Sequence, residues 1–491
     1  MYKENKIMLW LHMHQPDYLN PLSNEQILPW TRRHMLNSYY EIPKLLLSSS
    51  AKININFSGI LLKQIVSYAE EKLEDTWETL EKKDADSLTE SEKEFIIRNF
   101  LNPVANFNSN RFNKLINKKK NREKFNTQDM RDTQILYAIS AFSPDTTEVK
   151  GLINKKENYS EKDKIEEKKI ERKIFESIIP MYRELFARKQ IELTISPMQH
   201  PILPLLIDSS IACRSKQETI LPLTQFAHPN DAIKQMEDAI SLFSKIFGKM
   251  PQGMWPSEGS ISNKAIDIIK QKGIKWIGTD ESVLMRTNPY VKKEDISIPR
   301  NVRDLKIFFR NHYLSDKIGF AYNKMNPIDA VKDLLQTVKS SRNGEIIILD
   351  GENPWDFYPE CGVPFLTELF SALNQRNSAL GNEIEATDSI EAIHPGSWIN
   401  GYFDTWIGDE ESNRAWTYLA DTRKTVGSTQ ESLNQIYIAE GSDWFWWYSN
   451  LHKKEVDFTF DTLFRAHLIA AYQKAGIKIP SYLFQPIKEV K

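Results

Sequence analysis

The chain is poor in the residues on which several large classes of protein depend. Only 2 of its 491 residues are cysteines, and Cys213 and Cys361 lie too far apart in sequence for a zinc or redox motif. Glycine is scarce at 18 residues, and neither a G-x-G-x-x-G nor a P-loop pattern occurs. We therefore expect two idle thiols and no glycine-rich phosphate-binding loop.

The chain also lacks an excess of charge of either sign. Its 64 basic and 66 acidic residues give a net charge of −2, whereas nucleic-acid-binding proteins usually carry a large basic excess. No apolar run approaches the roughly 18 residues of a transmembrane helix. The apolar run at 7–11 is too short for a secretory signal and predicts a first strand. We expect a cytoplasmic protein with no nucleic-acid or membrane partner; the oligomeric state stays open.

Tryptophan, in contrast, is plentiful. Nine of the 12 tryptophans follow residue 250, in polar, turn-rich segments. Flat aromatic faces suit sugar rings, whose C–H faces are apolar and whose rims are polar. Residues 444–448 are five consecutive aromatics, which no single helix face can bury. These features favour a carbohydrate ligand, with an aromatic plug between domains as the alternative for residues 444–448.

Short apolar runs alternate with helical stretches over the first two thirds of the chain. Strands are predicted at 6–12, 53–57, 191–196, 275–278, 305–310 and 345–350, and helices between them include 232–247 and 263–272. This alternation indicates an α/β fold with a parallel sheet. Because no nucleotide fingerprint follows the first strand, we favour a (β/α) barrel over an open sheet.

Two kinds of segment interrupt this rhythm. Residues 68–99, 106–128 and 148–173 are rich in Lys, Glu and Asn, and residues from 365 onward show helical periodicity over 365–380, 412–425, 428–440 and 460–476. Acidic residues are interleaved in the first set, which favours solvated helices over a polyanion contact. We predict a catalytic barrel over 1–364 with charged helical insertions around 68–175. A C-terminal helical domain over 365–491 is predicted to contribute to the active site.

Two carboxylates stand where strands should end. Glu258 follows a short apolar stretch, and Asp350 follows four aliphatic residues. The carboxyl ends of barrel strands form the active face, and burial there raises a carboxyl pKa as a general acid requires. Glu352 lies two residues beyond Asp350, so spacing alone does not decide which is the acid. With Trp255 and Trp355 beside them, two such carboxylates are the minimum apparatus for glycoside cleavage. A helix N-terminal Glu and a turn-capping Asp are the structural alternatives.

His12 and His14 alternate on the first predicted strand, so both side chains can point the same way. Such a pair could present two imidazoles to zinc, with a third ligand from Asp350, His200 or His312. No recognisable H-x-H…Asp hydrolase spacing follows. We therefore favour hydrogen bonds from these histidines to sugar hydroxyls. The alternative is that both histidines have only a structural role at the top of the barrel.

Five short regions, in order along nearly the whole chain, resemble the motifs of glycoside hydrolase family 57. They are His14-Gln15-Pro16, Gln190-Ile191-Glu192, Trp255-Pro256-Ser257-Glu258, Asp350-Gly351-Glu352 and Ser442-Asp443-Trp444. Each motif alone is weak, but five in order with both carboxylates are specific. The chain departs from the family pattern at Lys189, Met198, Gln199 and Ala141, which bears on substrate fit more than on catalysis.

The resemblance implies a fold and a chemistry. The family fold is an incomplete (β/α)7 barrel followed by a C-terminal helical bundle, and its members cleave α-linked glucans with retention and without an essential metal. It makes Glu258 the nucleophile and Asp350 the acid/base, with no cofactor. The residues expected to bind an α-glucan or maltooligosaccharide are His12, His14, Glu192, Trp255, Glu352, Trp355, Asp443 and Trp444.

The motif sequences most resemble those of amylase- and amylopullulanase-like hydrolases. A 4-α-glucanotransferase or a branching enzyme on the same site is the alternative. Two further alternatives belong to other classes: a metal-dependent, deacetylase-like hydrolase and a non-catalytic glucan-binding protein. Chelation would abolish the activity of the metal-dependent hydrolase, and Glu258→Gln would leave the glucan affinity of the binding protein unchanged.

Overall fold

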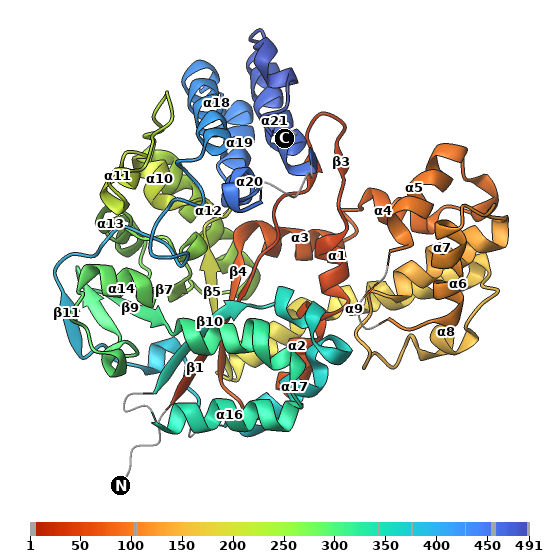
Figure 1. The fold of residues 1–491 in the computed structure, drawn as a ribbon, viewed down its shortest axis with the longest axis horizontal. Coiled ribbons are helices and arrows are strands. Elements are labelled where there is room, and N and C mark those ends of the chain that lie inside the picture. Colours follow the sequence, from red (N-terminus) through yellow and green to blue (C-terminus); the bar gives the residue numbers. More distant parts are fainter. Residues whose placement is uncertain are drawn as a thin grey trace.

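The computed structural model describes residues 6–102, 104, 107–340, 344–374, 377–427, 429–452 and 458–488. Its centre is a nine-stranded sheet in which seven neighbouring strands run parallel (Figure 1). In spatial order they are β10 (Glu345–Asp350), β1 (Ile7–Met13), β4 (Ile53–Ser58), β5 (Ile191–Ser196), β6 (Gly253–Met254), β7 (Trp276–Asp280) and β9 (Leu305–Arg310). Beyond β9 lie β8 (Arg300–Val302), which pairs antiparallel, and β11 (Asp388–Ile390) at the edge. A separate small hairpin joins β2 (Leu19–Asn20) to β3 (Glu25–Gln26).

The seven parallel strands curl into a barrel that does not fully close. The outer strands β9 and β10 share no strand ladder in the described part of the chain. They meet through the backbone bond from Asn311 N to Ile346 O (2.8 Å) and through Arg310 Nε, which donates to Ile348 O (2.7 Å). The predicted incomplete (β/α)7 barrel is confirmed.

Alternate residues of each strand point into the barrel, as the period of a strand requires. The inner cluster consists of Met8, Trp10, Trp255, Trp276, Phe308, Ile346 and Ile348. The intervening residues, such as Leu9 and Ile347, belong to the larger core under the surrounding helices. One step beyond the inner cluster, the last inward residues of β1 and β10 are His12 and Asp350, which are register neighbours. Polar side chains therefore gather above an aromatic floor.

Helices cover the outside of the barrel. They are α1 (Trp30–Met35), α2 (Ser38–Leu47), α3 (Gly59–Ala69), α9 (Glu161–Ala187), α10 (Leu203–Ile207), α11 (Ile211–Ser215), α12 (Pro229–Phe247), α13 (Asn263–Gln271), α14 (Glu281–Thr287), α15 (His312–Asp316), α16 (Pro327–Ser340) and α17 (Val363–Ala372). The helices predicted at 232–247 and 263–272 are present as α12 and α13. The helix predicted at 365–380 ends at Ala372 instead, because the Asn377 side chain accepts from Asn374 N (2.7 Å) and offers the backbone a turn. Helix α17 packs on α16 and α2, with the barrel.

The charged insertion forms a lobe to one side of the barrel (orange in Figure 1). It contains α4 (Thr76–Lys82), α5 (Glu90–Phe100), α6 (Asn110–Lys120), α7 (Thr127–Ile139) and α8 (Lys150–Lys155). The lobe has a core of its own, in which Trp77, Phe100 and Tyr137 stack with ring centroids 4.2 to 5.5 Å apart. The long helix α9 runs from this lobe back to the barrel.

Four more helices stand over the carboxyl ends of the strands (blue in Figure 1). They are α18 (Glu410–Val426), α19 (Gln430–Ala439), α20 (Ser442–Tyr448) and α21 (Phe458–Ala475). The helix predicted at 428–440 starts at a residue outside the described part. Arg423 of α18 holds Asp231 of α12 with two bonds (2.7 and 2.9 Å). Among the described residues, none of the helices is both long and apolar enough to cross a membrane.

Candidate active site

Glu258 is presented by a sharp turn directly after the two-residue strand β6. Its backbone is left-handed (φ 58°, ψ 26°), a conformation that costs a non-glycine residue about 1–2 kcal/mol and persists only when its surroundings enforce it. Trp255 helps to enforce this conformation, because its ring lies inside the barrel and packs edge-on against Trp10 (centroids 5.6 Å apart). The Glu258 carboxyl therefore stands at the carboxyl end of β6, on the side where barrel enzymes bind substrate.

Donors hold both oxygens of Glu258. Trp398 Nε1 donates to Oε2 (2.9 Å), and Ser442 Oγ lies 3.1 Å from Oε1. Burial, together with the charges of Asp443 and Asp350, raises the Glu258 pKa to about 7; His14 and the Ser442 hydroxyl oppose this rise. Glu258 is thus a desolvated carboxyl whose charged form depends on these donors.

Asp350 ends β10 and enters the same site. Its side chain accepts from Asn353 Nδ2 (3.2 Å), and burial raises its pKa, while Asn353, Arg310 and His14 work in the opposite direction. Arg310 is itself fixed by Asp316 (2.6 Å). The Asp350 charge is also among the causes that raise the Glu258 pKa, so the two carboxyls act on one site.

Glu352 serves a different purpose from Asp350. Its side chain is 1% exposed, and Oε1 accepts from His14 N (2.9 Å), Tyr39 OH (3.1 Å) and Gln15 Nε2 (3.4 Å). Burial raises its pKa well above the usual value. Glu352 therefore ties down the segment after β1.

The two predicted histidines belong to a stack of three. His200, from the loop after β5, packs against both His12 (centroids 5.0 Å apart) and His14 (3.9 Å), whose own centroids are 6.0 Å apart. Burial lowers the His12 pKa to about 3, so this neutral ring donates from Nδ1 to Asn56 Oδ1 (2.7 Å). Burial also acts to lower the His14 pKa, but Asp443, 2.9 Å from Nε2, raises it overall. Of the two predicted histidines, His12 is therefore neutral and His14 favours the charged form.

The structure adds His200, Trp398 and Ser442 to the predicted set. The sequence offered a weak signal for each of them. From sequence, His200 is a candidate metal ligand only, Trp398 stands in a loop bounded by Gly396 and Gly401, and Ser442 is one residue of a short motif. No pattern in a single sequence shows that these three residues converge on one carboxylate.

Three of the predicted substrate-binding tryptophans lie in the core. Trp255, Trp355 and Trp444 are at most 2% exposed. The indole nitrogens of Trp355 and Trp444 donate to backbone carbonyls at Gly351 (2.8 Å) and Ile438 (2.8 Å). Neighbours on a helix point about 100° apart, so Asp443 reaches the site while Trp444 faces the bundle. The structure does not place these rings at an open sugar-binding surface.

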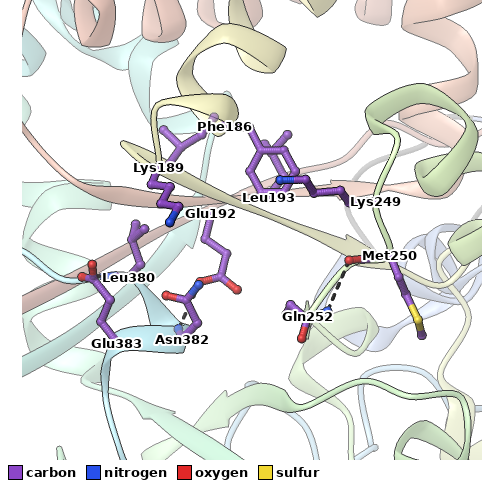
Figure 2. A pocket seen from close by; sticks show the side chains of 11 residues that line it. Phe186, Lys189, Glu192, Leu193, Lys249, Met250, Gln252, Leu380, Asn382 and Glu383 are labelled. Atoms are coloured by element: carbon purple, nitrogen blue, oxygen red, sulfur yellow. Dashed lines mark hydrogen bonds between the residues drawn. The ribbon is translucent and has the colours of Figure 1, made fainter.

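Glu192 lies at the opposite end of the barrel from Glu258. It is the second residue of β5, four residues and thus about 13 Å before the carboxyl end of that strand. Its oxygens accept from Trp276 Nε1 (3.1 Å) and Asn382 N (3.0 Å). Figure 2 shows it beside a cavity of about 660 Å³ that Lys189 also lines. The structure therefore does not bring Glu192 into the candidate active site.

Three side chains come close enough together to suggest a metal. His14, His200 and Asp443 each offer a ligand atom within 4.8 Å of the others, and no other such group occurs in the part of the chain that is described. However, the rings of His14 and His200 are stacked at 22°, so their in-plane lone pairs run side by side rather than converge. His14 Nε2 already bonds Asp443. This arrangement suits hydrogen bonding better than tetrahedral ligation.

Residues 8–397 match the model of a known family, described as glycosyl hydrolase family 57. This match covers more than half of the chain, and the chain belongs to glycosyl hydrolase family 57. No curated protein matches the chain in sequence.

Solved structures share the fold at low sequence identity. A branching enzyme of family 57 from Thermococcus kodakaraensis, in complex with glucose, has a TM-score of 0.60 and 13% identity, over 98% of this chain and 93% of that one. The α-amylase AmyC from Thermotoga maritima has a TM-score of 0.56 and 13% identity, over 98% and 96%. The 4-α-glucanotransferase from Thermococcus litoralis has a TM-score of 0.57 and 14% identity, over 96% and 60%. At these identities the similarity shows the fold.

Proposed function

We propose that this protein is a retaining enzyme that cleaves α-glucans, with Glu258 as nucleophile and Asp350 as acid/base. One observation carries the proposal: two desolvated carboxyls stand at the carboxyl ends of barrel strands β6 and β10, and both act on the same His14 side chain. Family membership supports glycoside chemistry. The structural relatives, described as a branching enzyme, an α-amylase and a 4-α-glucanotransferase, support an α-glucan substrate.

In this mechanism Glu258 attacks the anomeric carbon and forms a glycosyl-enzyme, while Asp350 protonates the departing oxygen. Asp350 then takes a proton from the acceptor, which attacks the anomeric carbon and releases Glu258. Burial keeps Asp350 able to carry a proton, and Arg310 nearby favours its return to the charged form. Water as acceptor gives hydrolysis, and a sugar hydroxyl gives transfer.

The histidines supply complementary contacts for sugar hydroxyls. Because His12 donates through Nδ1 to Asn56, its Nε2 is left as an acceptor for a hydroxyl proton. His14 is held between Asp443 at Nε2 and Ser58 Oγ at Nδ1 (2.7 Å), so its charge acts on the site without its ring turning. His12 would therefore contact a hydroxyl of the sugar that Glu258 attacks, whereas His14 would act on that sugar through its charge.

The experiment is a product analysis. Purified protein is incubated with maltoheptaose, with and without a chelator, beside Glu258→Ala and Glu258→Gln. Shorter products alone indicate hydrolysis, and products both longer and shorter indicate transfer. Turnover that survives the chelator and is lost in both variants supports the proposal. Loss with the chelator would favour the metal-dependent alternative, and binding without turnover would favour the glucan-binding protein.

A cytoplasmic location is part of the proposal. It rests on the apolar run at 7–11, which forms part of the buried barrel strand β1. Cell fractionation with an antibody against the protein tests it, and recovery in a secreted fraction would contradict it.

A further inference from the structure

Ser442 connects the helical region to the candidate nucleophile. It is the first residue of α20, it is fully buried, and its Oγ lies 3.1 Å from Glu258 Oε1. The same Oγ is 3.0 Å from His200 Nδ1, and Ser442 N donates to His200 O (3.0 Å). Ser442 is thus fixed from both its backbone and its side chain.

The direction of each hydrogen bond in this chain follows from what each group can do. A carboxylate only accepts, so the Ser442 hydroxyl donates to Glu258 Oε1. The Ser442 oxygen is then free to accept from His200 Nδ1–H. Burial and the neighbouring histidines keep the His200 pKa well below its usual value, so the ring is neutral and carries one proton. His200 Nε2 is buried and has no hydrogen-bond partner among the described residues, which agrees with that proton residing on Nδ1.

The hydrogen-bond chain from His200 through Ser442 opposes the effect that burial has on the ionisation of Glu258. Burial and two neighbouring carboxylates favour its neutral form, whereas the Ser442 hydroxyl favours its charged form. The indole N–H of Trp398 can only donate and so also favours the charged form. Protonation of Oε1 would require the Ser442 hydroxyl proton to turn away from Glu258. The chain of donors therefore defines one orientation of the carboxylate.

We propose that Ser442, backed by His200, is a positioning residue that fixes Glu258 Oε1 for attack, so that the seating of α20 on the barrel controls the nucleophile. This inference rests on the proposed function. Ser442 itself touches no reacting atom of the sugar, and acts through Glu258.

The test isolates the nucleophile from the acid. In an Asp350→Ala background, α-maltosyl fluoride is the substrate, because fluoride departs without a proton from the enzyme. The pH dependence of kcat/KM then reports the ionisation of Glu258. Ser442→Ala and Ser442→Thr are compared with Ser412→Ala, which removes another buried serine hydroxyl, one that donates to Asp409 O (3.0 Å) in the helical region.

We expect Ser442→Ala to move the acid limb of the kcat/KM pH profile upward by about one pH unit. The rate at the plateau of that profile should fall about 10-fold, with KM within two-fold of the parent. Ser442→Thr keeps the hydroxyl and should restore the limb, and Ser412→Ala should match the parent. If the alanine variant does not fold, Ser442→Cys, a weak donor of similar size, takes its place.

The inference is overturned if the acid limb of the kcat/KM profile stays unchanged in Ser442→Ala. It is also overturned if the alanine and threonine variants lose the plateau rate equally and neither shifts that limb. Failure of the proposed function looks different. In that case Glu258→Ala in the same background would still release fluoride, or the Asp350→Ala parent would release none.

Discussion

Single residues in the site are arranged so that each charged group has a specific counterpart. Glu258 has Ser442 and Trp398, His14 has Asp443, and Arg310 lies near Asp350. Each of these pairs joins segments far apart in the sequence. The properties of each group therefore depend on the fold rather than on its neighbours along the chain, and substitutions of the counterparts test the site.

Trp398→Phe keeps the aromatic ring but removes the donor to Glu258 Oε2. A hydrogen bond to a charged group contributes about 1.5–3 kcal/mol, so we expect kcat to fall about 10- to 100-fold with little change in KM. The measurement is steady-state kinetics on maltoheptaose. Trp77→Phe, in the helical insertion, is the matched control and should stay within two-fold. Equal activity of the two variants would show that the indole N–H is dispensable.

Glu192→Gln distinguishes the structure from the expectation based on motifs. The amide would keep one acceptor but turn an N–H toward a donor, either Trp276 Nε1 or Asn382 N. We expect a loss of about 1–3 kcal/mol in the free energy of unfolding and kcat/KM within three-fold of the parent. Urea unfolding and kinetics measure the two effects. A large loss of kcat/KM without a loss of stability would show instead that Glu192 acts in the active site.

The sequence predicted the residues that depend on strand period and strand ends. His12 and Asp350 follow from alternation along two strands, and Glu258 follows from the end of a third. Trp355 and Trp444 could not be placed, because a tryptophan in a polar segment looks the same whether it lies in the core or at the surface. Glu192 is assigned to the site by its motif alone, although the strand predicted at 191–196 places it at the amino end, away from the active face.

At the scale of elements, the helical insertion is joined to the barrel by a buried charge cluster. Arg32 of α1 is 1% exposed and bonds Asp75 (2.7 Å), Glu81 (2.8 Å) and Glu171 (3.1 Å). Lys168 of α9 also bonds Glu81 (2.7 Å). The sequence showed only charged helices here. It could not reveal the pairing, since alternating charges look the same on a solvated face and in a buried network.

Glu167 within this cluster makes stability depend on pH. Burial raises its pKa to about 8, and Oε1 has no hydrogen-bond partner among the described residues. The folded protein therefore keeps this proton up to about pH 8, whereas the unfolded chain releases it near pH 4.5. Stability from this group is present below pH 4.5 and is lost as the pH rises to 8.

We expect Glu167→Gln to match the parent near pH 5 and to exceed its free energy of unfolding by about 2–4 kcal/mol at pH 8.5. Urea unfolding at the two pH values measures the difference. Glu166→Gln is the control, because Glu166 is the exposed neighbour on the same helix and should show no such dependence. A constant difference between Glu167→Gln and the parent across this range would contradict the buried, protonated state.

At the scale of the whole molecule, the helical region completes a site that the barrel begins. Ser442 and Asp443 come from α20, while Glu258, His14 and His200 come from the barrel. Glu440, just before α20, receives a bond from Gln235 of α12 (2.8 Å), next to the pair of Arg423 with Asp231. We expect stability and activity to be coupled through this contact.

Arg423→Ala leaves the Asp231 carboxylate, whose side chain is 2% exposed, without its cation. Removing one partner of a buried pair costs about 3–5 kcal/mol, so we expect a lower unfolding midpoint and a loss of kcat as α20 shifts. Arg414→Ala, on the same helix with the exposed partner Glu410, should cost less than about 1 kcal/mol. Thermal unfolding and kinetics on both variants make the comparison. Equal effects would mean that the contact does not seat α20.

The central claim is that Glu258 forms a covalent glycosyl-enzyme. The most direct measurement incubates the protein with 5-fluoro-α-glucosyl fluoride, which slows release of the intermediate, and follows it by intact-protein and peptide mass spectrometry. The account predicts one added glycosyl unit, located on Glu258 and absent from Glu258→Gln. A label on any other residue, or continued turnover of maltoheptaose without a trapped label and with inverted products, would contradict it.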